Sequence, residues 1–303
     1  MSEPVRVVLW ACPRTCSSSF LKCMSKIPDT QVLFELFTTA HHYGPERDQT
    51  VAITFQKEPH VDTKVEKNGL LARESQSGFH SSVATYSFAK KQLEADYQGK
   101  KVIIAKEMAQ CLIPKLDHLP KGYQHVFLIR NPVKVFPSWK KIIQEVLMVR
   151  YGELTALDDL IIDRQAQDVM PSGFGFKETY ELYQYIKDNK LGPEPIIIDT
   201  EDLKNNPAGI LSQFCERVGL PYTDDLLAWE KGSDVADSWI ISQRHKFILK
   251  NAKTCEVFRE STKFNKSPMG NENGVAKLTA DIQRCVDASI PYYTKMFEQR
   301  LKV

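Results

Sequence analysis

The sequence has no run of apolar residues near the roughly 18 that a membrane-spanning helix needs, so no transmembrane segment is expected. Its first residues, Met1 to Pro4, carry no basic stretch followed by a long apolar one, and we expect no secretory signal there. Net charge is also small, because 40 Lys and Arg oppose 38 Asp and Glu for a formal charge of +2. This balance does not favour a general basic field that would bind nucleic acid, although it is compatible with a local basic site.

Cysteines are few and odd in number. The seven cysteines are spread from Cys12 to Cys285, and without an expected secretory signal they are predicted to be reduced thiols of a cytoplasmic protein. Cys12 and Cys16 could form a metal or redox pair, but no second Cys/His pair at ligand spacing accompanies them. We therefore predict no metal site from the sequence.

Apolar patterning predicts an α/β fold. The chain is 42% hydrophobic and 26% charged, which is ordinary for a globular protein with a sizeable core. Short apolar or β-branched runs predict buried strands at residues 5–11, 102–105, 126–129 and 196–198. Helices are predicted at residues 17–26, 133–149, 207–218 and 278–301. Strands that alternate with helices indicate a mainly parallel sheet covered on both faces, and without a repeat or low-complexity linker we expect one domain over residues 1–303.

Prolines and weakly patterned stretches qualify this prediction. Pro132 suits the first turn of its helix, whereas Pro137 should kink that helix or mark its true start, and Pro291 should interrupt the last one. Residues 60–98 and 231–277 have weak patterning and are predicted to form loops or lids.

The loop after the first predicted strand has the composition of an anion site. Residues 12–20 read Cys-Pro-Arg-Thr-Cys-Ser-Ser-Ser-Phe, so the start of the following helix is rich in hydroxyl groups. Free N–H groups and the positive end of the helix dipole would face an anion there, and Arg14 adds a fixed charge. The loop is not a Walker A sequence, and Cys16 stands where a glycine would be expected. From this loop alone, a serine-rich helix cap without a ligand is an equally good interpretation.

A second stretch supplies groups for another phosphate. Arg130-Asn131-Pro132 follows a predicted strand, and Ser138 comes eight residues after the arginine. Taken singly, Arg130 could be a surface charge at a strand end and Ser138 an ordinary helix residue, at about even odds. Together with the first loop, the two residues indicate a nucleotide with two separate anionic ends.

With both stretches in view, the chain resembles the sulfotransferases that use 3′-phosphoadenylyl sulfate (PAPS). Their 5′-phosphate loop reads roughly Pro-Lys/Arg-Ser/Thr-Gly-Thr/Ser-Thr, and residues 13–18 here read Pro-Arg-Thr-Cys-Ser-Ser. Their 3′-phosphate site is an Arg followed by a Ser eight residues later, similar to Arg130 and Ser138. Thr200-Glu201-Asp202-Leu203 is similar to the family's Tyr-Glu-Asp-Leu segment. The resemblance spans residues 5 to about 220.

This resemblance implies a P-loop-like, three-layer α/β fold and PAPS as the cofactor, with 3′-phosphoadenosine 5′-phosphate (PAP) as the product. The acceptor is expected to be a small molecule with a hydroxyl or amine, and neither nucleic acid nor a membrane is an expected partner. The residues implied to bind the cofactor are Arg14, Thr15, Cys16, Ser17, Ser18, Ser19, Arg130 and Ser138.

The catalytic residues follow less directly, because the chain departs from the family pattern. The chain is most similar to a divergent branch that reads Lys-His-Met before the arginine strand, and here Lys106-Glu107-Met108 stands in that place. Met108 falls where cytosolic members carry the His that acts as general base. Glu35 and Glu107 are the candidate bases, Glu35 first, while Arg14 and Lys106 could supply positive charge. The alternative for each carboxylate is a solvated or ion-paired group.

The expected reaction is in-line displacement of a sulfuryl group from PAPS. One alternative is a Mg-dependent nucleotide kinase, because Ile196-Ile197-Ile198-Asp199 looks like a Walker B strand; another is a non-catalytic nucleotide-binding protein. The histidines of the acceptor-side segments are more often surface residues than bases: His41, His42, His60 and His80. Trp229 and Trp239 are expected in the core. Gly270 and Gly274 with Lys277 faintly resemble the family's 3′-phosphate segment.

Overall fold

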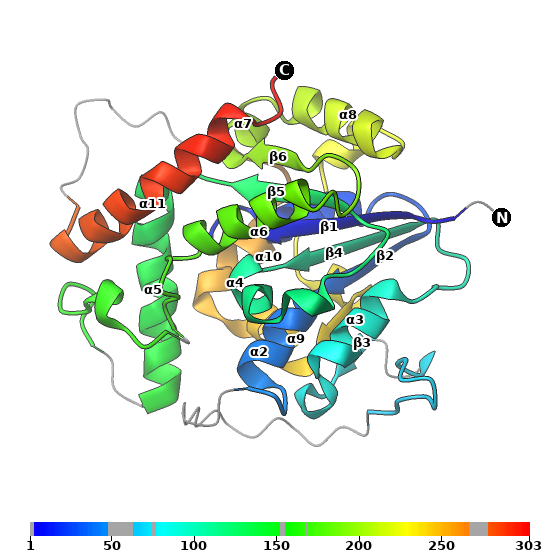
Figure 1. The fold of residues 1–303 in the computed structure, drawn as a ribbon, viewed down its shortest axis with the longest axis horizontal. Coiled ribbons are helices and arrows are strands. Elements are labelled where there is room, and N and C mark those ends of the chain that lie inside the picture. Colours follow the sequence, from blue (N-terminus) through cyan, green and yellow to red (C-terminus); the bar gives the residue numbers. More distant parts are fainter. Residues whose placement is uncertain (1–2, 48–62, 74–76, 152–154, 168, 267–277) are drawn as a thin grey trace.

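The protein folds around one sheet of parallel strands. The computed structural model describes residues 3–47, 63–73, 77–151, 155–167, 169–266 and 278–303. Within these residues the sheet has seven strands in the order β3-β7-β2-β4-β1-β5-β6, and every neighbouring pair is parallel (Figure 1). The strands are β1 (Val5–Ala11), β2 (Thr30–Phe34), β3 (Ser77–Phe79), β4 (Val102–Glu107), β5 (Gln124–Ile129), β6 (Ile196–Asp199) and β7 (Ile240–Ser242).

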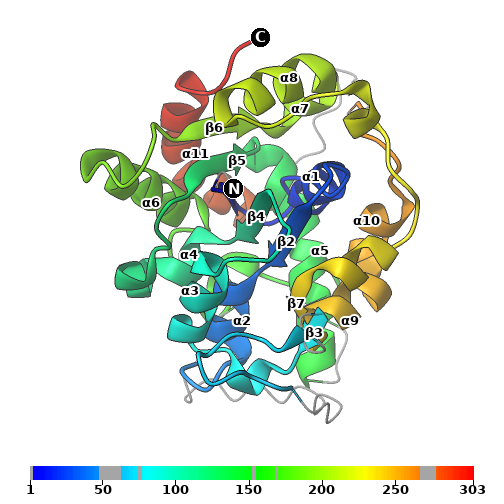
Figure 2. The ribbon, with the colours of Figure 1, turned by 90° about the vertical axis from the view of Figure 1, so that its right-hand side faces the viewer.

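Helices cover both faces of the sheet. They are α1 (Ser17–Met24), α2 (Leu36–Tyr43), α3 (Tyr86–Glu94), α4 (Ala109–Leu112), α5 (Pro132–Tyr151), α6 (Phe176–Asp188), α7 (Thr200–Asn205), α8 (Pro207–Val218), α9 (Gln243–Asn251), α10 (Glu256–Glu260) and α11 (Ala280–Glu298). Figure 2 shows α3, α4 and α6 on one side of the sheet and α1 and α10 on the other.

Alternation along β1 explains why the core has two halves. Val7 and Leu9 pack in one hydrophobic cluster with side chains of α1 and α8, whereas Val8 and Trp10 pack in another with side chains of α2, α3 and α6. Successive side chains of a strand point to opposite faces, so a strand buried on both sides reads as a continuous apolar run. The predicted three-layer α/β fold with a parallel sheet is confirmed.

Four strands and four helices were predicted from their patterning and are confirmed in place. β1 and α8 have the predicted bounds, while β4 continues to Glu107 and β6 to Asp199. The prediction of loops or lids for residues 60–98 and 231–277 is wrong in part, because the described residues there include β3, α3, β7, α9 and α10. β3 and β7 have three residues each, too few for a periodic pattern, and their backbone pairing is what holds them.

The prolines also behave differently from the prediction. Pro132 begins α5 as expected, but Pro137 lies inside that helix and does not mark its start. Pro291 does not interrupt α11, which continues to Glu298. A proline inside a helix removes one hydrogen bond and costs about 3 kcal/mol. Here α5 and α11 pack on each other through a third buried cluster, and that burial offsets the loss.

Parallel strands place all their carboxyl ends at one edge of the sheet, and the candidate site lies along this edge. The register aligns Phe34 of β2 with Lys106 of β4, and Trp10 of β1 with both Glu107 of β4 and Phe127 of β5. Glu35, the loop after β1 and Arg130 follow directly from these aligned strand ends. In open α/β sheets, ligands bind at this carboxyl edge.

Candidate active site

The loop between β1 and α1 holds two residues in the left-handed backbone region. Arg14 has φ 68° and Cys16, the N-cap of α1, has φ 61°. This conformation costs roughly 1–2 kcal/mol for a residue other than glycine, which explains why a glycine would be expected at Cys16. The Thr15 hydroxyl donates to the Cys12 carbonyl at 2.9 Å and fixes the turn.

The N-terminus of α1 has no side-chain cap from its own N-cap residue. The Cys16 side chain accepts no capping hydrogen bond, and no acidic residue lies in the first turn of the helix. Ser17 and Ser19 are buried, and Ser18 is half-buried. The first N–H groups of a helix have no partner within the helix, so this end favours a negative charge.

The loop and the second predicted phosphate stretch are in direct contact. Arg14 Nε donates to Ser138 Oγ at 2.7 Å, and Arg130 Nη1 donates to the Arg14 carbonyl at 3.0 Å. Arg14 Nη1 also donates to the Thr254 carbonyl at 3.1 Å. The fold thus brings together two stretches that lie far apart in the sequence.

The segment after β6 holds this contact in place. The Thr200 hydroxyl lies 2.8 Å from the Ile129 carbonyl and 3.0 Å from the Thr15 carbonyl, so its single proton can be donated to either. Glu201 accepts from Arg130 Nε at 3.0 Å and from Lys134 Nζ at 2.8 Å. The Thr-Glu segment predicted from the resemblance therefore joins the ends of β5 and β6 to the loop after β1.

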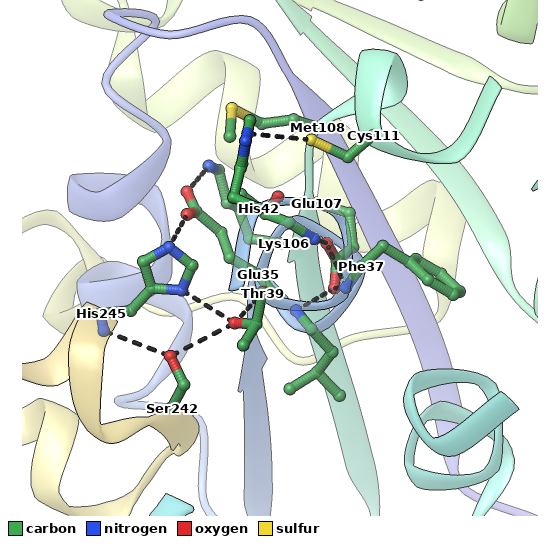
Figure 3. A network of polar contacts seen from close by, with 12 residues as sticks. Glu35, Phe37, Thr39, His42, Lys106, Glu107, Met108, Cys111, Ser242 and His245 are labelled. Carbon is green, nitrogen blue, oxygen red and sulfur yellow. Dashed lines mark hydrogen bonds and ion pairs between the residues drawn. The ribbon is translucent and has the colours of Figure 1, made fainter. Parts of the chain in front are cut away.

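A second group of polar side chains lies at the ends of β2, β4 and β7 (Figure 3). Lys106 Nζ forms an ion pair with Glu35 Oε1, and His245 Nε2 lies 3.3 Å from Glu35 Oε2. The three side chains are only 5% to 12% exposed. Burial raises the pKa of Glu35, but the positive charges of Lys106 and His245 outweigh burial and hold that pKa below its ordinary value.

His245 is held by a short chain of hydroxyl groups. Thr39 Oγ1 donates to the Glu35 carbonyl at 2.8 Å, and it lies 3.1 Å from His245 Nδ1 and 3.2 Å from Ser242 Oγ. Ser242 Oγ caps α9 by accepting from the His245 N–H at 3.2 Å. The sequence carried no signal for His245, because it lies in a weakly patterned segment some 200 residues from Glu35.

Glu107 faces the opposite way from Lys106 along β4 and serves helix α2. Its carboxylate accepts from the N–H groups of Leu36 at 2.5 Å, Phe37 at 3.2 Å and Thr38 at 3.4 Å. Burial raises the pKa of Glu107 to about 8, and the N–H donors offset part of that rise. Its oxygens are occupied by the first turn of α2, an arrangement that positions Glu35 at the N-cap of the same helix.

Asp199, the residue that suggested a Walker B strand, is also engaged in a cap. It accepts from the N–H groups of Glu201 at 2.8 Å and Asp202 at 3.3 Å, and the Tyr293 hydroxyl donates to it at 3.1 Å. β6 is moreover the edge strand, with β5 between it and β1. These contacts give Asp199 a structural role.

Other residues named from the sequence lie as follows. Trp229 and Trp239 are buried in the core as predicted. His41 and His42 are half-buried near the end of α2, and His80 Nδ1 lies 2.7 Å from Ser82 Oγ. His60, Gly270, Gly274 and Lys277 lie outside the described residues.

In the part of the chain that the structure describes, no helix is long and apolar enough to cross a membrane.

Comparisons with known proteins add three kinds of finding. Two Arabidopsis thaliana relatives, the branched-chain-amino-acid aminotransferase-like proteins 1 and 2, are each 23% identical, over 240 and 245 residues. These matches take in 77% and 78% of this chain but 33% and 34% of those proteins, so the chain spans about a third of the length of its curated relatives.

Solved sulfotransferase structures are similar over most of the chain, at low identity. The sulfotransferase domain of the Synechococcus PCC 7002 olefin synthase is 14% identical, with a TM-score of 0.43 and 95% of each chain covered. Mouse sulfotransferase SULT7A1, solved with PAP, is 12% identical, with a TM-score of 0.49 over 99% of this chain and 86% of that one. Retinol dehydratase, solved with retinol and PAP, is 12% identical, with a TM-score of 0.44 over 100% and 84%.

A family model described as a sulfotransferase domain matches residues 163–299. This segment begins beyond Arg130 and Ser138 and includes the Thr200–Leu203 segment, β6, β7 and His245. The family-model match and the sequence motifs thus point to the same family.

Proposed function

We propose that this protein is a PAPS-dependent sulfotransferase that transfers a sulfuryl group to the hydroxyl or amine of a small-molecule acceptor. The observation that carries the proposal is the joint arrangement at the carboxyl edge of the sheet. There the loop after β1 meets Arg130 and Ser138, and the Glu35–Lys106 pair lies at the carboxyl ends of the neighbouring strands β2 and β4. The sulfotransferase-domain match supports it from a different part of the chain.

In this proposal the two basic stretches hold the two phosphate ends of the nucleotide. The N–H groups at the start of α1 and the side chain of Arg14 bind the 5′ end, and Arg130 with Ser138 binds the 3′-phosphate. Each hydrogen bond to a charged group is worth roughly 1.5–3 kcal/mol. Arg14 would exchange its contact with Ser138 for the nucleotide, and Arg130 would keep Glu201 as an orienting partner.

Lys106 and Glu35 have different roles in the proposed reaction. In an in-line displacement the acceptor oxygen or nitrogen forms a bond to sulfur while the bond from sulfur to the bridging phosphate oxygen breaks, and PAP leaves. Lys106 and Arg14 stabilise the negative charge that builds on the bridging oxygen. Glu35 takes the acceptor's proton. When Lys106 turns from Glu35 to the donor, the Glu35 carboxylate loses a cation and becomes a stronger base.

Glu107 has a positioning role in this proposal, because its carboxylate already caps α2. The kinase alternative is not favoured, since the chain lacks Walker A glycines and lysine and Asp199 caps α7. Seven free cysteines are compatible with the cytoplasm as the proposed location. The acceptor is proposed only as a class, a small molecule with a hydroxyl or amine.

Calorimetric titration with PAP, beside ATP with Mg²⁺ and plain AMP, tests the donor site. We expect PAP to bind more tightly than either, and Arg130→Ala to weaken PAP by about 10- to 100-fold, the loss of one charged contact. Lys134→Ala is the matched control, because Lys134 also pairs with Glu201 but lies in the first turn of α5 and is 46% exposed, against 16% for Arg130. A preference for Mg-ATP would support the kinase instead, and equal losses in both variants would contradict a direct role for Arg130.

Glu35→Gln tests the catalytic assignment. Release of PAP from PAPS is measured against a panel of small alcohols, phenols and amines. The variant should bind PAP within about twofold of the native protein, while turnover falls by about 10²-fold or more because the general base is gone. Binding of PAP without turnover in the native protein for any acceptor would favour a nucleotide-binding protein without catalysis.

A further inference from the structure

Two histidines and a cysteine come together beside the candidate active site. His41 and His42 lie near the end of α2, and Cys111 lies in α4, some 70 residues later. One ligand atom from each of the three side chains lies within 4.8 Å of the others. His42 Nε2 is 3.7 Å from Cys111 Sγ, as Figure 3 shows. We call these three residues the His–Cys cluster.

The spacing of the His–Cys cluster is close to that of a tetrahedral metal site. Zinc binds thiolate sulfur at about 2.3 Å and imidazole nitrogen at about 2.0–2.1 Å, which puts neighbouring ligand atoms roughly 3.3–3.6 Å apart. The 3.7 Å between His42 Nε2 and Cys111 Sγ is already near this value. The ligand atom of His41 lies within 4.8 Å of the other two, so it would have to move closer by about 1.5 Å at most. Side-chain rotation alone can supply such a movement.

Tyr86 orients the ring of His41 and determines its tautomer. The Tyr86 hydroxyl donates its single proton to the Cys111 carbonyl at 2.9 Å. His41 Nδ1 lies 3.0 Å from the same hydroxyl oxygen and must therefore donate to it. This tautomer carries its lone pair on Nε2. A ligand histidine whose other nitrogen donates to a neighbouring group is the usual arrangement in metal sites.

We propose that His41, His42 and Cys111 bind a zinc ion. Imidazole and thiolate together favour zinc over magnesium or calcium, which prefer oxygen. Among the described residues the cluster offers three protein ligands, so a tetrahedral ion keeps its fourth position for water or another ligand. Cys111 is buried, while His41 and His42 are each half-buried. The proposal stands apart from the sulfotransferase proposal, since no step of that reaction uses the ion.

Metal content and spectroscopy of the full chain test the zinc site. After removal of metal by a chelator, the protein should bind one equivalent of zinc by calorimetry. Co²⁺ in its place should give the visible bands of a tetrahedral ion and a thiolate-to-cobalt band in the near ultraviolet. Cys111→Ser should abolish the thiolate band and the stoichiometric zinc binding, and Tyr86→Phe should weaken zinc by about 10- to 100-fold through the lost orienting contact.

Matched variants make the outcome decisive. Cys215→Ser removes another buried cysteine, from α8, and should leave zinc binding unchanged. His42→Ala replaces a half-buried side chain and should lose zinc even where Cys111→Ser disturbs folding, which circular dichroism would show. Absence of stoichiometric zinc binding by the native protein overturns the proposal. So does a thiolate band that survives in folded Cys111→Ser, because the metal would then be at another cysteine.

Discussion

Glu35 is the residue at which backbone strain, burial and charge meet. Its φ of 54° places it in the left-handed region, which is costly for a residue with a side chain, and its carboxylate lies between Lys106 and His245. Strained residues persist where the surrounding structure holds them, and they concentrate at functional sites. Arg14 and Cys16 share this conformation in the loop after β1. Residues with a strained backbone thus occur both in the loop after β1 and at Glu35, beside Lys106 and His245.

Replacement of His245 should alter the pH dependence of turnover. His245→Gln removes one of the two positive charges that lower the pKa of Glu35, so that pKa should rise. A base works only when deprotonated, and the acid limb of kcat/KM should therefore move to higher pH. The measurement is a pH–rate profile for PAPS with an acceptor found in the panel.

Arg244→Gln is the control for this change. Arg244 is the neighbouring cation, and its guanidinium lies 5.2 Å from the centre of the Tyr43 ring. This variant should leave the acid limb in place. An acid limb that stays unchanged in His245→Gln, or moves to lower pH, would show that His245 does not tune the base.

Glu107 should make the stability of the protein depend on pH. Its pKa of about 8 in the folded protein lies above its ordinary pKa of 4.5. The stability that Glu107 contributes is therefore full below about pH 4.5 and is lost as pH rises through about 8. Glu107→Gln cannot titrate and should lack this loss. Urea unfolding of both proteins at several pH values between 5 and 9 measures it. Parallel curves would mean that the N–H groups of α2 keep the carboxylate ionised throughout.

At the scale of elements, helix positions were more predictable than helix continuity. The apolar pattern and Pro132 placed the start of α5, and the pattern of α8 gave both of its ends. The interruption predicted at Pro291 did not occur, since packing between α5 and α11 outweighs one missing hydrogen bond. Short strands such as β7 exist because β2 and β3 pair with them, and a local pattern cannot show that.

A buried ion pair between Lys140 and Asp281 links α5 to α11. Asp281 Oδ2 accepts from Lys140 Nζ at 3.0 Å and from the Ile162 N–H at 3.1 Å, and the two charged side chains are 7% and 4% exposed. Burial raises the pKa of Asp281, but its hydrogen bonds outweigh burial and lower that pKa to about 2. The stability that the ionised Asp281 contributes is therefore present above pH 3.8, its ordinary pKa. It is lost as pH falls through about 2, its pKa in the folded protein.

Asp281→Asn should destabilise the protein by about 3–5 kcal/mol at neutral pH, because it leaves the buried charge of Lys140 without a partner. Chemical unfolding measures the change, and Lys140→Met in the same background should restore part of it. The control is Asp163→Asn, which breaks the pair with Arg284 on the same helix. Arg284 is half exposed, and such a pair is worth about 0–1 kcal/mol. Equal losses in the two variants would contradict the assignment.

At the scale of the whole molecule, a nucleotide at the sheet edge would contact segments that follow several strands. The loop after β1, Arg130 after β5 and Lys106 in β4 belong to one sheet, so a ligand that binds them stabilises the folded state as a unit. PAP at 100 times its dissociation constant should add about 2.7 kcal/mol. For a chain of this size the melting temperature should then rise by about 4 °C.

A thermal-shift measurement with PAP and AMP tests this linkage. AMP lacks the 3′-phosphate and should give a smaller rise at the same concentration. Arg130→Ala should reduce the response to PAP, whereas Lys134→Ala should not. Equal shifts for PAP and AMP would contradict a two-ended nucleotide site.

That residues 1–303 form one domain stays a prediction.

The sequence by itself determined the local features of this protein. Apolar runs specified β1, β4, β5 and β6, because a strand buried on both faces must be apolar throughout. The loop after β1 and Arg130 with Ser138 were recognisable because contiguous residues or fixed spacings form them. Tertiary structure alone decided which of these groups meet. Pairing of β7 with β2 brings His245 to Glu35, and packing of α4 on α2 brings Cys111 to His42. Such contacts depend on sheet order and helix packing, which no local pattern encodes.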